Sequence, residues 1–184
     1  MPEKFETSQW VPYPVEMVFA FFANPANLPH LMPAWQQPRI ESSRIQAPPA
    51  RPVSADPALR FQSPAAGAGS EMLFSFRPFP GLPLRLKWLA HITEFVWFSH
   101  FTDEQVVGPF AAWQHRHQIT PETRETQSGT CITDKVEYTL PMGPLGSLAN
   151  ALFVRSQMHQ TFAYRQRRLE QILPVVARQA ARRS

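Results

Sequence analysis

Residues 110–119 (FAAWQHRHQI) and 130–140 (TCITDKVEYTL) decide the fold of this chain. In both stretches apolar residues alternate with polar ones, and side chains two residues apart share one face of a β-strand. Trp113 and Ile119 mark the apolar face of the first stretch, and Val136 marks that of the second. The pattern predicts two neighbouring strands of a sheet that has one buried face.

The same alternation continues toward the N-terminus. We predict strands over 4–11, 71–78, 83–95, 97–107, 110–119 and 130–140. Short connections separate the last five of these strands, whereas a parallel sheet would need long helical crossovers between them. The sequence therefore predicts an antiparallel meander.

Two short helical segments follow the opening strand. Val15, Val18 and Phe22 recur at the spacing of one helix face, and the helix is expected to stop at Pro25. A second helical turn is predicted over 26–32. These segments are too short to serve as crossovers, so they are expected to pack beside the sheet.

A long helix is predicted near the C-terminus, capped by Ser147, running to about Leu173 and ended by Pro174 or slightly later. Its apolar residues form one stripe at about 100° per residue. The stripe comprises Leu148, Ala151, Leu152, Met158, Phe162, Leu169 and Leu173. Arg155 and His159 fall within it. We expect this face to lie on the sheet, which gives a two-layer α+β order.

The composition indicates a folded protein in a reducing compartment. Of the 184 residues, 43% are hydrophobic and 17% charged, which fits a single domain over 1–176 followed by a basic tail over 177–184. A lone Cys131 excludes an intramolecular disulfide, and neither a secretory signal nor an apolar span of about 20 residues is present. We expect a cytoplasmic protein with no integral membrane segment. The net charge of +4 is concentrated near the C-terminus, where cations suit a helix end, so no nucleic-acid partner is predicted.

Several polar side chains fall on the inward faces of the predicted elements. They are Asp103, Gln105, His115, His117, Asp134, Arg155 and His159. Buried ionisable groups cost free energy unless they are paired or face a wet cavity. Three interpretations stay open: a structural network, the polar end of a ligand cavity, or a catalytic acid–base set. Because Arg155 keeps its charge, we expect Asp134 to hold one side of it and a ligand anion the other.

Local motifs for cofactors are missing from the sequence. His115 and His117 resemble half of a metal site, but no further ligand stands at motif-like spacing, so no metal is predicted. The chain lacks G-x-G-x-x-G, a P-loop and G-x-S-x-G. We therefore expect no cofactor and no serine hydrolase.

Eight stretches of the chain resemble the bacterial SRPBCC ligand-binding proteins, a START-like superfamily. They are 16–28 (EMVFAFFANPANL), 101–105 (FTDEQ), 108–110 (GPF), 113–117 (WQHRH), 129–134 (GTCITD), 138–146 (YTLPMGPLG), 152–155 (LFVR) and 162–165 (FAYR). The resemblance covers most of residues 3–173. Relatives have a shorter link where this chain has the Pro-, Ala- and Gly-rich stretch 46–69, which we read as a long irregular loop, either a lid or an insertion.

The resemblance implies a helix-grip fold. In it about seven antiparallel strands curve around a long C-terminal helix, with two short helices after the first strand and a hydrophobic cavity inside. The superfamily includes polyketide cyclase/dehydrases and lipid-transfer domains, and relatives of this subgroup are similar to a domain fused to epimerase-like proteins. We expect residues 141–147 and 46–69 to border the cavity mouth and to be mobile, since Gly143 and Gly146 permit backbone adjustment.

The leading functional hypothesis is binding or carriage of a small hydrophobic or amphipathic ligand, such as a lipid, a quinone or an aromatic polyketide. One alternative is a cyclase or dehydratase that uses His, Asp and Arg of the cavity. Another is a regulatory partner of an epimerase-like protein or oxidoreductase. The expected ligand-binding residues are the seven inward polar residues above together with Phe19, Phe22, Trp88, Phe101, Trp113, Tyr138, Met158 and Phe162.

Overall fold

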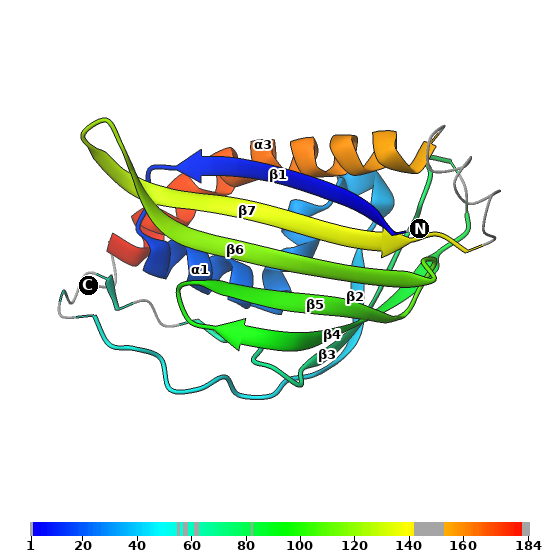
Figure 1. The fold of residues 1–184 in the computed structure, drawn as a ribbon, viewed down its shortest axis with the longest axis horizontal. Coiled ribbons are helices and arrows are strands. Elements are labelled where there is room, and N and C mark those ends of the chain that lie inside the picture. Colours follow the sequence, from blue (N-terminus) through cyan, green and yellow to red (C-terminus); the bar gives the residue numbers. More distant parts are fainter. Residues whose placement is uncertain are drawn as a thin grey trace.

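One curved antiparallel sheet organises the residues that the computed structural model describes, which are 2–54, 56, 59–60, 63–81, 83–141 and 153–181. Its seven strands are β1 (Glu3–Val11), β2 (Arg39–Arg44), β3 (Glu71–Phe76), β4 (Leu86–Val96), β5 (His100–Val107), β6 (Ala112–Arg124) and β7 (Gln127–Thr139). Their order is β1-β7-β6-β5-β4-β3-β2, so the first strand lies at one edge of the sheet, beside the last strand (Figure 1). The predicted antiparallel α+β fold is confirmed.

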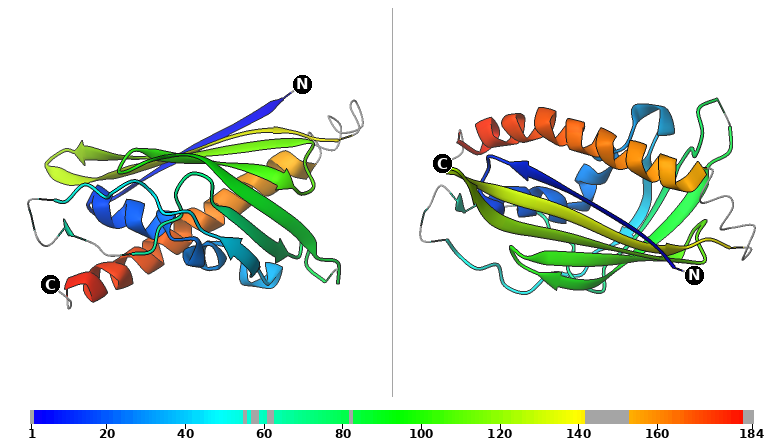
Figure 2. Two further views of the ribbon diagram at one scale, coloured as in Figure 1. Left: turned by 90° about the horizontal axis from the view of Figure 1, so that it is seen from below. Right: turned by 45° about the horizontal axis from the view of Figure 1, so that its top comes forward.

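The helices lie together on one side of this sheet. The described helices are α1 (Val15–Ala23), η1 (Pro25–Leu31), η2 (Ala34–Gln36) and α3 (Arg155–Ala181). Figure 2 shows α3 running obliquely across the sheet, with the short helical segments beside it. The two predicted short segments are confirmed as α1 and η1, and η2 adds one further turn. None of the described helices has an apolar stretch long enough to cross a membrane.

The predicted end of the long helix is wrong. Pro174 lies inside α3, and the helix continues to Ala181, so residues 177–181 are helical and do not start a separate tail. A helix can retain an internal proline when tertiary packing holds it, and the buried Leu169 and Leu173 supply that packing here. The predicted cap Ser147 and the stripe residues Leu148, Ala151 and Leu152 lie outside the described residues, as does most of the loop 141–147.

Strand β2 was not found from the sequence. Its residues RIESSR show no alternation, and all six are exposed in the structure. It pairs with β3 at the edge of the sheet, with a register shift between Ile40 and Ser42. An edge strand with no buried face carries no periodic signal, so the seventh strand was implied only by the family resemblance.

Strands β6 and β7 form the longest pairing of the sheet and place the polar residues of the site. The pairing runs from Ala112 opposite Thr139 to Arg124 opposite Gln127, which is longer than the predicted strands. Glu125 has a φ of 52°, the positive value that a tight hairpin turn requires. The register sets His117 directly opposite Asp134. In the neighbouring pair, Asp103 of β5 lies opposite His115.

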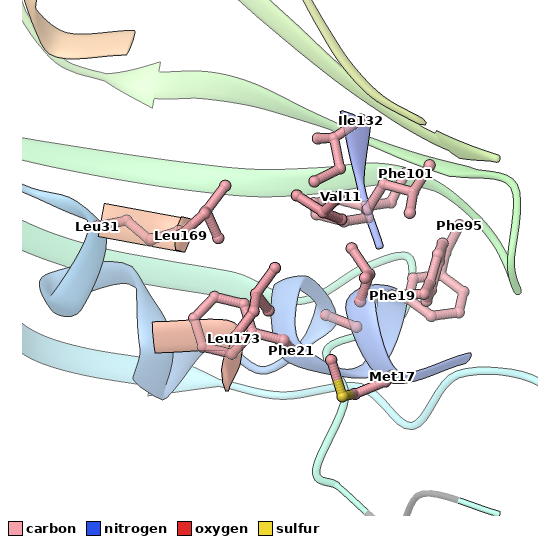
Figure 3. Close-up of a cluster of buried hydrophobic side chains, with 13 residues drawn as sticks. Val11, Met17, Phe19, Phe21, Leu31, Phe95, Phe101, Ile132, Leu169 and Leu173 are labelled. Atoms are coloured by element: carbon pink, nitrogen blue, oxygen red, sulfur yellow. The ribbon is translucent and has the colours of Figure 1, made fainter. Parts of the chain in front are cut away.

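Two buried apolar clusters hold the helices on the sheet. The larger joins α1, α3 and the sheet, and Figure 3 shows Phe19, Phe95, Phe101, Leu169 and Leu173 within it. The smaller gathers Phe5, Val136, Tyr138, Met158 and Phe162 near the start of α3. Burying side chains of this size contributes roughly 1.5–3 kcal/mol each. The two clusters hold α3 against the sheet at two points along its length. A cavity remains between α3 and strands β3 to β6.

Candidate functional site

A cavity of about 600 Å³ lies between the sheet, the short helical segments and α3. Most of its wall is apolar and aromatic. The apolar residues that line it include Phe22, Leu28, Leu31, Met72, Phe74, Phe76, Leu86, Trp88, Ala90, Phe101, Phe110, Trp113, Met158 and Phe162. This volume and this lining are typical of ligand pockets, and the sequence predicted a hydrophobic ligand cavity.

Trp88 of β4 is at the centre of the aromatic wall. Its ring meets that of Trp113 edge-on, with centroids 5.0 Å apart, and stacks on Phe74 at 5.8 Å. Phe110 meets both Trp88 and Trp113 at 5.7 and 4.9 Å. Because the rings brace one another, this part of the wall is preformed.

Asp103, His115 and His117 place a polar patch on this wall. All three line the cavity, and their positions on β5 and β6 follow from the strand alternation. One oxygen of Asp103, Oδ2, is 3.3 Å from His117 Nε2 and 3.7 Å from His115 Nδ1. The two imidazole rings lie side by side, with centroids 3.8 Å apart. The ligating atoms of the three residues all lie within 4.8 Å of one another.

Asp134 of β7 supports the histidines from behind the wall. Its Oδ1 atom is 3.0 Å from His115 Nε2 and 2.9 Å from His117 Nδ1. Burial by itself would raise the pKa of the Asp134 carboxyl, but the charge of Arg165 and the hydrogen bonds from both histidines hold that pKa well below its usual range. Burial and the neighbouring His117 lower the pKa of His115. At neutral pH, Asp134 is therefore an anion beside a neutral His115.

Arg165 of α3 completes the polar patch and was missed by the sequence analysis. Its Nη2 is 3.6 Å from Asp134 Oδ1, and its guanidinium lies over the Phe22 ring at 4.8 Å. From the sequence, the positive charge near the C-terminus was interpreted as belonging to a helix end. Its spacing from Phe162 and Leu169, three and four residues away on the buried stripe, was the signal that could have identified it.

The predictions for Arg155 and His159 are wrong. Both side chains are exposed, and neither is among the described residues that line the cavity. Arg155 is the first residue of α3, and its side chain is exposed although it falls on the predicted stripe. His159 packs its ring edge-on against Phe5 at 5.0 Å. Arg165, six residues further along than His159, takes the role expected of Arg155 beside Asp134.

The other expected site residues divide between the cavity wall and the core. Nine line the cavity: Phe22, Trp88, Phe101, Asp103, Trp113, His115, His117, Met158 and Phe162. Phe19 and Tyr138 are instead in the two core clusters. Gln105 stabilises the turn between β5 and β6. Its side-chain amide donates to the Phe110 carbonyl at 2.8 Å and accepts from the Phe110 N–H at 3.2 Å. Of the loop 46–69, Ala66 reaches the wall.

Comparison with known proteins agrees with this geometry. A family model described as polyketide cyclase / dehydrase and lipid transport matches residues 11–165. No curated protein sequence matches the chain significantly. A solved structure of norcoclaurine synthase from Thalictrum flavum, in complex with dopamine and hydroxybenzaldehyde, is 11% identical, with a TM-score of 0.55 over 93% of this chain and 88% of that chain.

Two further solved structures share the fold. A ginseng major latex-like protein from Panax ginseng is 11% identical, with a TM-score of 0.54 over 92% of this chain and 95% of that chain. A nucleoside-diphosphate sugar epimerase from Corynebacterium glutamicum is 24% identical, with a TM-score of 0.55 over 96% of this chain but 30% of that chain. At these identities the likeness shows the helix-grip fold alone, because one fold serves many functions.

Proposed function

Since this chain belongs to the polyketide cyclase/dehydrase and lipid transport family, we propose that it binds a small amphipathic molecule inside the cavity. The apolar body of the ligand lies against the aromatic wall around Trp88, and its polar end faces Asp103, His115 and His117. The observation that carries the proposal is that one cavity of about 600 Å³ combines a mostly apolar wall with the patch of Asp103, His115 and His117.

The shape and chemistry of the wall indicate the ligand class. Ligand pockets commonly range from about 300 to 1,000 Å³ and combine apolar walls with a few fixed polar groups. The edge-on and stacked rings of Trp88, Trp113 and Phe74 offer faces and edges to a flat aromatic or quinone-like body. A ligand with a hydrogen-bond donor such as a hydroxyl at one end can bind the Asp103 carboxyl oxygens of this patch.

Cavity filling tests the proposal. Ala90 lines the cavity and is buried, so Ala90→Leu adds methylenes into the space that the ligand would occupy. We expect this substitution to weaken binding of the fluorescent probe 8-anilinonaphthalene-1-sulfonate by about 1–3 kcal/mol, the scale of overpacking. Fluorescence titration measures the affinity, and quinone- and fatty-acid-like competitors should displace the probe from the unmodified protein.

Ala111→Leu is the matched control for this experiment. It makes the same chemical change at an exposed position just before β6, outside the described lining of the cavity. Its probe affinity should equal that of the unmodified protein. Equal affinities of the Ala90→Leu and Ala111→Leu variants would show that the probe binds elsewhere and would contradict the proposal.

A second candidate function is supported by the contact between Asp103 and the two imidazoles. A carboxylate beside an imidazole at the wall of a mostly apolar cavity is an arrangement used for general acid–base catalysis, including the ring closures and dehydrations of polyketide-like substrates. Product analysis after incubation with a linear poly-β-ketone tests it. Turnover that is lost in His117→Gln and retained in His159→Gln supports catalysis, and unchanged turnover in His117→Gln contradicts it.

A further inference from the structure

Three potential ligand atoms converge on one point of the cavity wall. The contacts of 3.0 and 2.9 Å from Asp134 Oδ1 to His115 Nε2 and His117 Nδ1 use one ring nitrogen of each histidine, which donates because a carboxylate oxygen can only accept. The other ring nitrogen of each histidine is left for a further partner. These nitrogens, His115 Nδ1 and His117 Nε2, both face Asp103 Oδ2 at 3.7 and 3.3 Å.

A cation placed among the three atoms would be held strongly. Both histidines are buried, so bulk water screens the attraction between a cation and these atoms poorly. The spacing of the three atoms suits an ion. Ligands about 2.0–2.2 Å from a tetrahedral zinc ion lie about 3.3–3.6 Å from each other. The distance of 3.3 Å from Asp103 to His117 falls in this range, and that of 3.7 Å to His115 lies just above it.

The surroundings of the two histidines resemble the outer layer of a metal site. Histidines that bind a metal usually donate their second N–H to a carboxylate, which fixes the tautomer and the direction of the lone pair. Asp134 accepts from both histidines at once. It also faces Arg165, whose positive charge keeps this carboxylate ionised when it is buried.

Arg165 also lies 3.2 Å from His117 Nδ1, a contact that would suit the opposite tautomer, with Nδ1 accepting. The contact of Asp134 with the same nitrogen is shorter, at 2.9 Å, and a deprotonated Nδ1 there would face an anion with no proton between them. The tautomer with Nδ1–H is therefore favoured. The guanidinium then acts on Asp134 as its charge partner.

We propose that Asp103, His115 and His117 form a binding site for a divalent transition-metal ion of the zinc type. Two imidazole nitrogens and one carboxylate oxygen are a usual ligand set for such ions, and three protein ligands leave a fourth position open. All three residues line the cavity, so the open position faces it. An anionic oxygen of a bound molecule, such as an enolate, a phenolate or a carboxylate, can occupy it.

This inference does not depend on the identity of a cavity ligand. It concerns the ion alone, and it holds whether the protein carries a molecule or transforms one. If probe binding in the cavity fails but metal binding succeeds, the proposed ligand function is wrong and the metal site stands. If probe binding succeeds but metal binding fails, the metal site is wrong and the proposed ligand function stands.

Metal titration of the tag-free, chelator-treated protein tests the site. Isothermal titration calorimetry with Zn²⁺ should show one ion per chain, and Co²⁺ should give the visible absorption bands of a four-coordinate site. Asp103→Asn and His117→Gln each remove a ligand and should weaken binding by more than tenfold. Asp134→Asn leaves the ligands in place and should weaken it by about 10–100-fold, the scale for an outer carboxylate.

His30→Gln is the matched control, because His30 is exposed and outside the cluster. It should bind both ions as the unmodified protein does. Circular dichroism identifies any variant that fails to fold. Anomalous X-ray scattering from zinc-soaked crystals of the unmodified protein then locates the ion without any substitution, and a peak between Asp103, His115 and His117 is expected.

Two results would overturn the proposal. The first is the absence of saturable one-to-one binding of Zn²⁺ or Co²⁺ to the unmodified protein. In that case a proton on one imidazole satisfies the three atoms and the cluster is a hydrogen-bonded network. The second is an anomalous peak elsewhere, or binding that folded Asp103→Asn and His117→Gln variants retain in full.

Discussion

At the scale of single residues, the ion pair between Arg165 and Asp134 gives the buried carboxylate of Asp134 a positive partner. Their side chains are 12% and 8% exposed, so removing one partner leaves a nearly buried charge. We expect Arg165→Met to lower the free energy of unfolding by about 3–5 kcal/mol, the scale for breaking a buried pair. Urea denaturation followed by circular dichroism measures it.

Arg155→Met is the control for that substitution, because it makes the same change at an exposed position on the same helix. Surface substitutions of this kind usually alter stability by no more than about 0.5 kcal/mol. A loss of stability in Arg155→Met comparable with that in Arg165→Met would show that Arg155 has buried partners and that the present assignment of the two arginines is wrong.

The sequence predicted the strand residues of the site better than the helix residues. On a strand, alternation leaves two faces, so Asp103, His115, His117 and Asp134 were all placed inward correctly. On a helix, Arg155 and Arg165 both point within about one residue's rotation of the buried stripe. Which of the two arginines meets Asp134 depends on which part of α3 lies opposite β7. Only the tertiary structure shows this.

At the scale of elements, the packing of β1 on β7 depends on a glycine. Gly129 is buried, and a Cβ at this position would meet the Trp10 ring and would lie 2.5 Å from the carbonyl oxygen of Val11. The Trp10 ring is held in place, since its Nε1–H donates to the Glu122 carbonyl at 3.0 Å. Gly129→Ala should therefore move backbone as well as a side chain.

We expect Gly129→Ala to destabilise the protein by about 1–3 kcal/mol, the cost of overpacking a site that cannot relax. Thermal unfolding measures the change. Ser128→Ala, at the exposed neighbouring position, is the control and should leave the midpoint nearly unchanged. Equal midpoints for the two variants would contradict the close approach of β1 at Gly129.

Pro174 gives a second prediction for an element. Inside α3 it donates no hydrogen bond, and its ring crowds the carbonyl of Glu170 one turn earlier. Pro174→Ala should raise the free energy of unfolding by about 1–3 kcal/mol, since proline costs about 3 kcal/mol relative to alanine in a helix interior. Val175→Ala, at an exposed site, is the control for loss of side-chain volume. A less stable Pro174→Ala variant would mean that the ring contributes more by packing than it costs.

The elements that the sequence revealed are those with a buried face. Six of the strands and three helical segments have such a face and were predicted, with errors at their ends. β2 has none and was not assigned. The helix continued past Pro174 because Leu173 and its neighbours pack against the larger core cluster, and a local stop signal carries no information about that packing.

At the scale of the whole molecule, ligand binding and stability are linked. A ligand that binds the folded state alone stabilises it by about 2.7 kcal/mol when its concentration is one hundred times the dissociation constant. A saturating probe should therefore raise the unfolding midpoint of the unmodified protein and of Ala111→Leu, and raise that of Ala90→Leu less. Differential scanning fluorimetry with an intrinsic tryptophan signal measures this. Equal increases in all three proteins would place the probe outside the cavity.

The pairing of β1 with β7 also has a consequence for how the protein is made. Glu3 lies opposite Tyr138, so β1, which is synthesised before the other strands of this sheet, has no partner until almost the whole sheet has been made. Closing so long a loop delays folding, because the entropy of the intervening chain is lost before the contacts form. During translation the β1 segment, with Phe5 and Trp10 uncovered, is a site where a chaperone would be expected to bind, until β7 emerges and releases it.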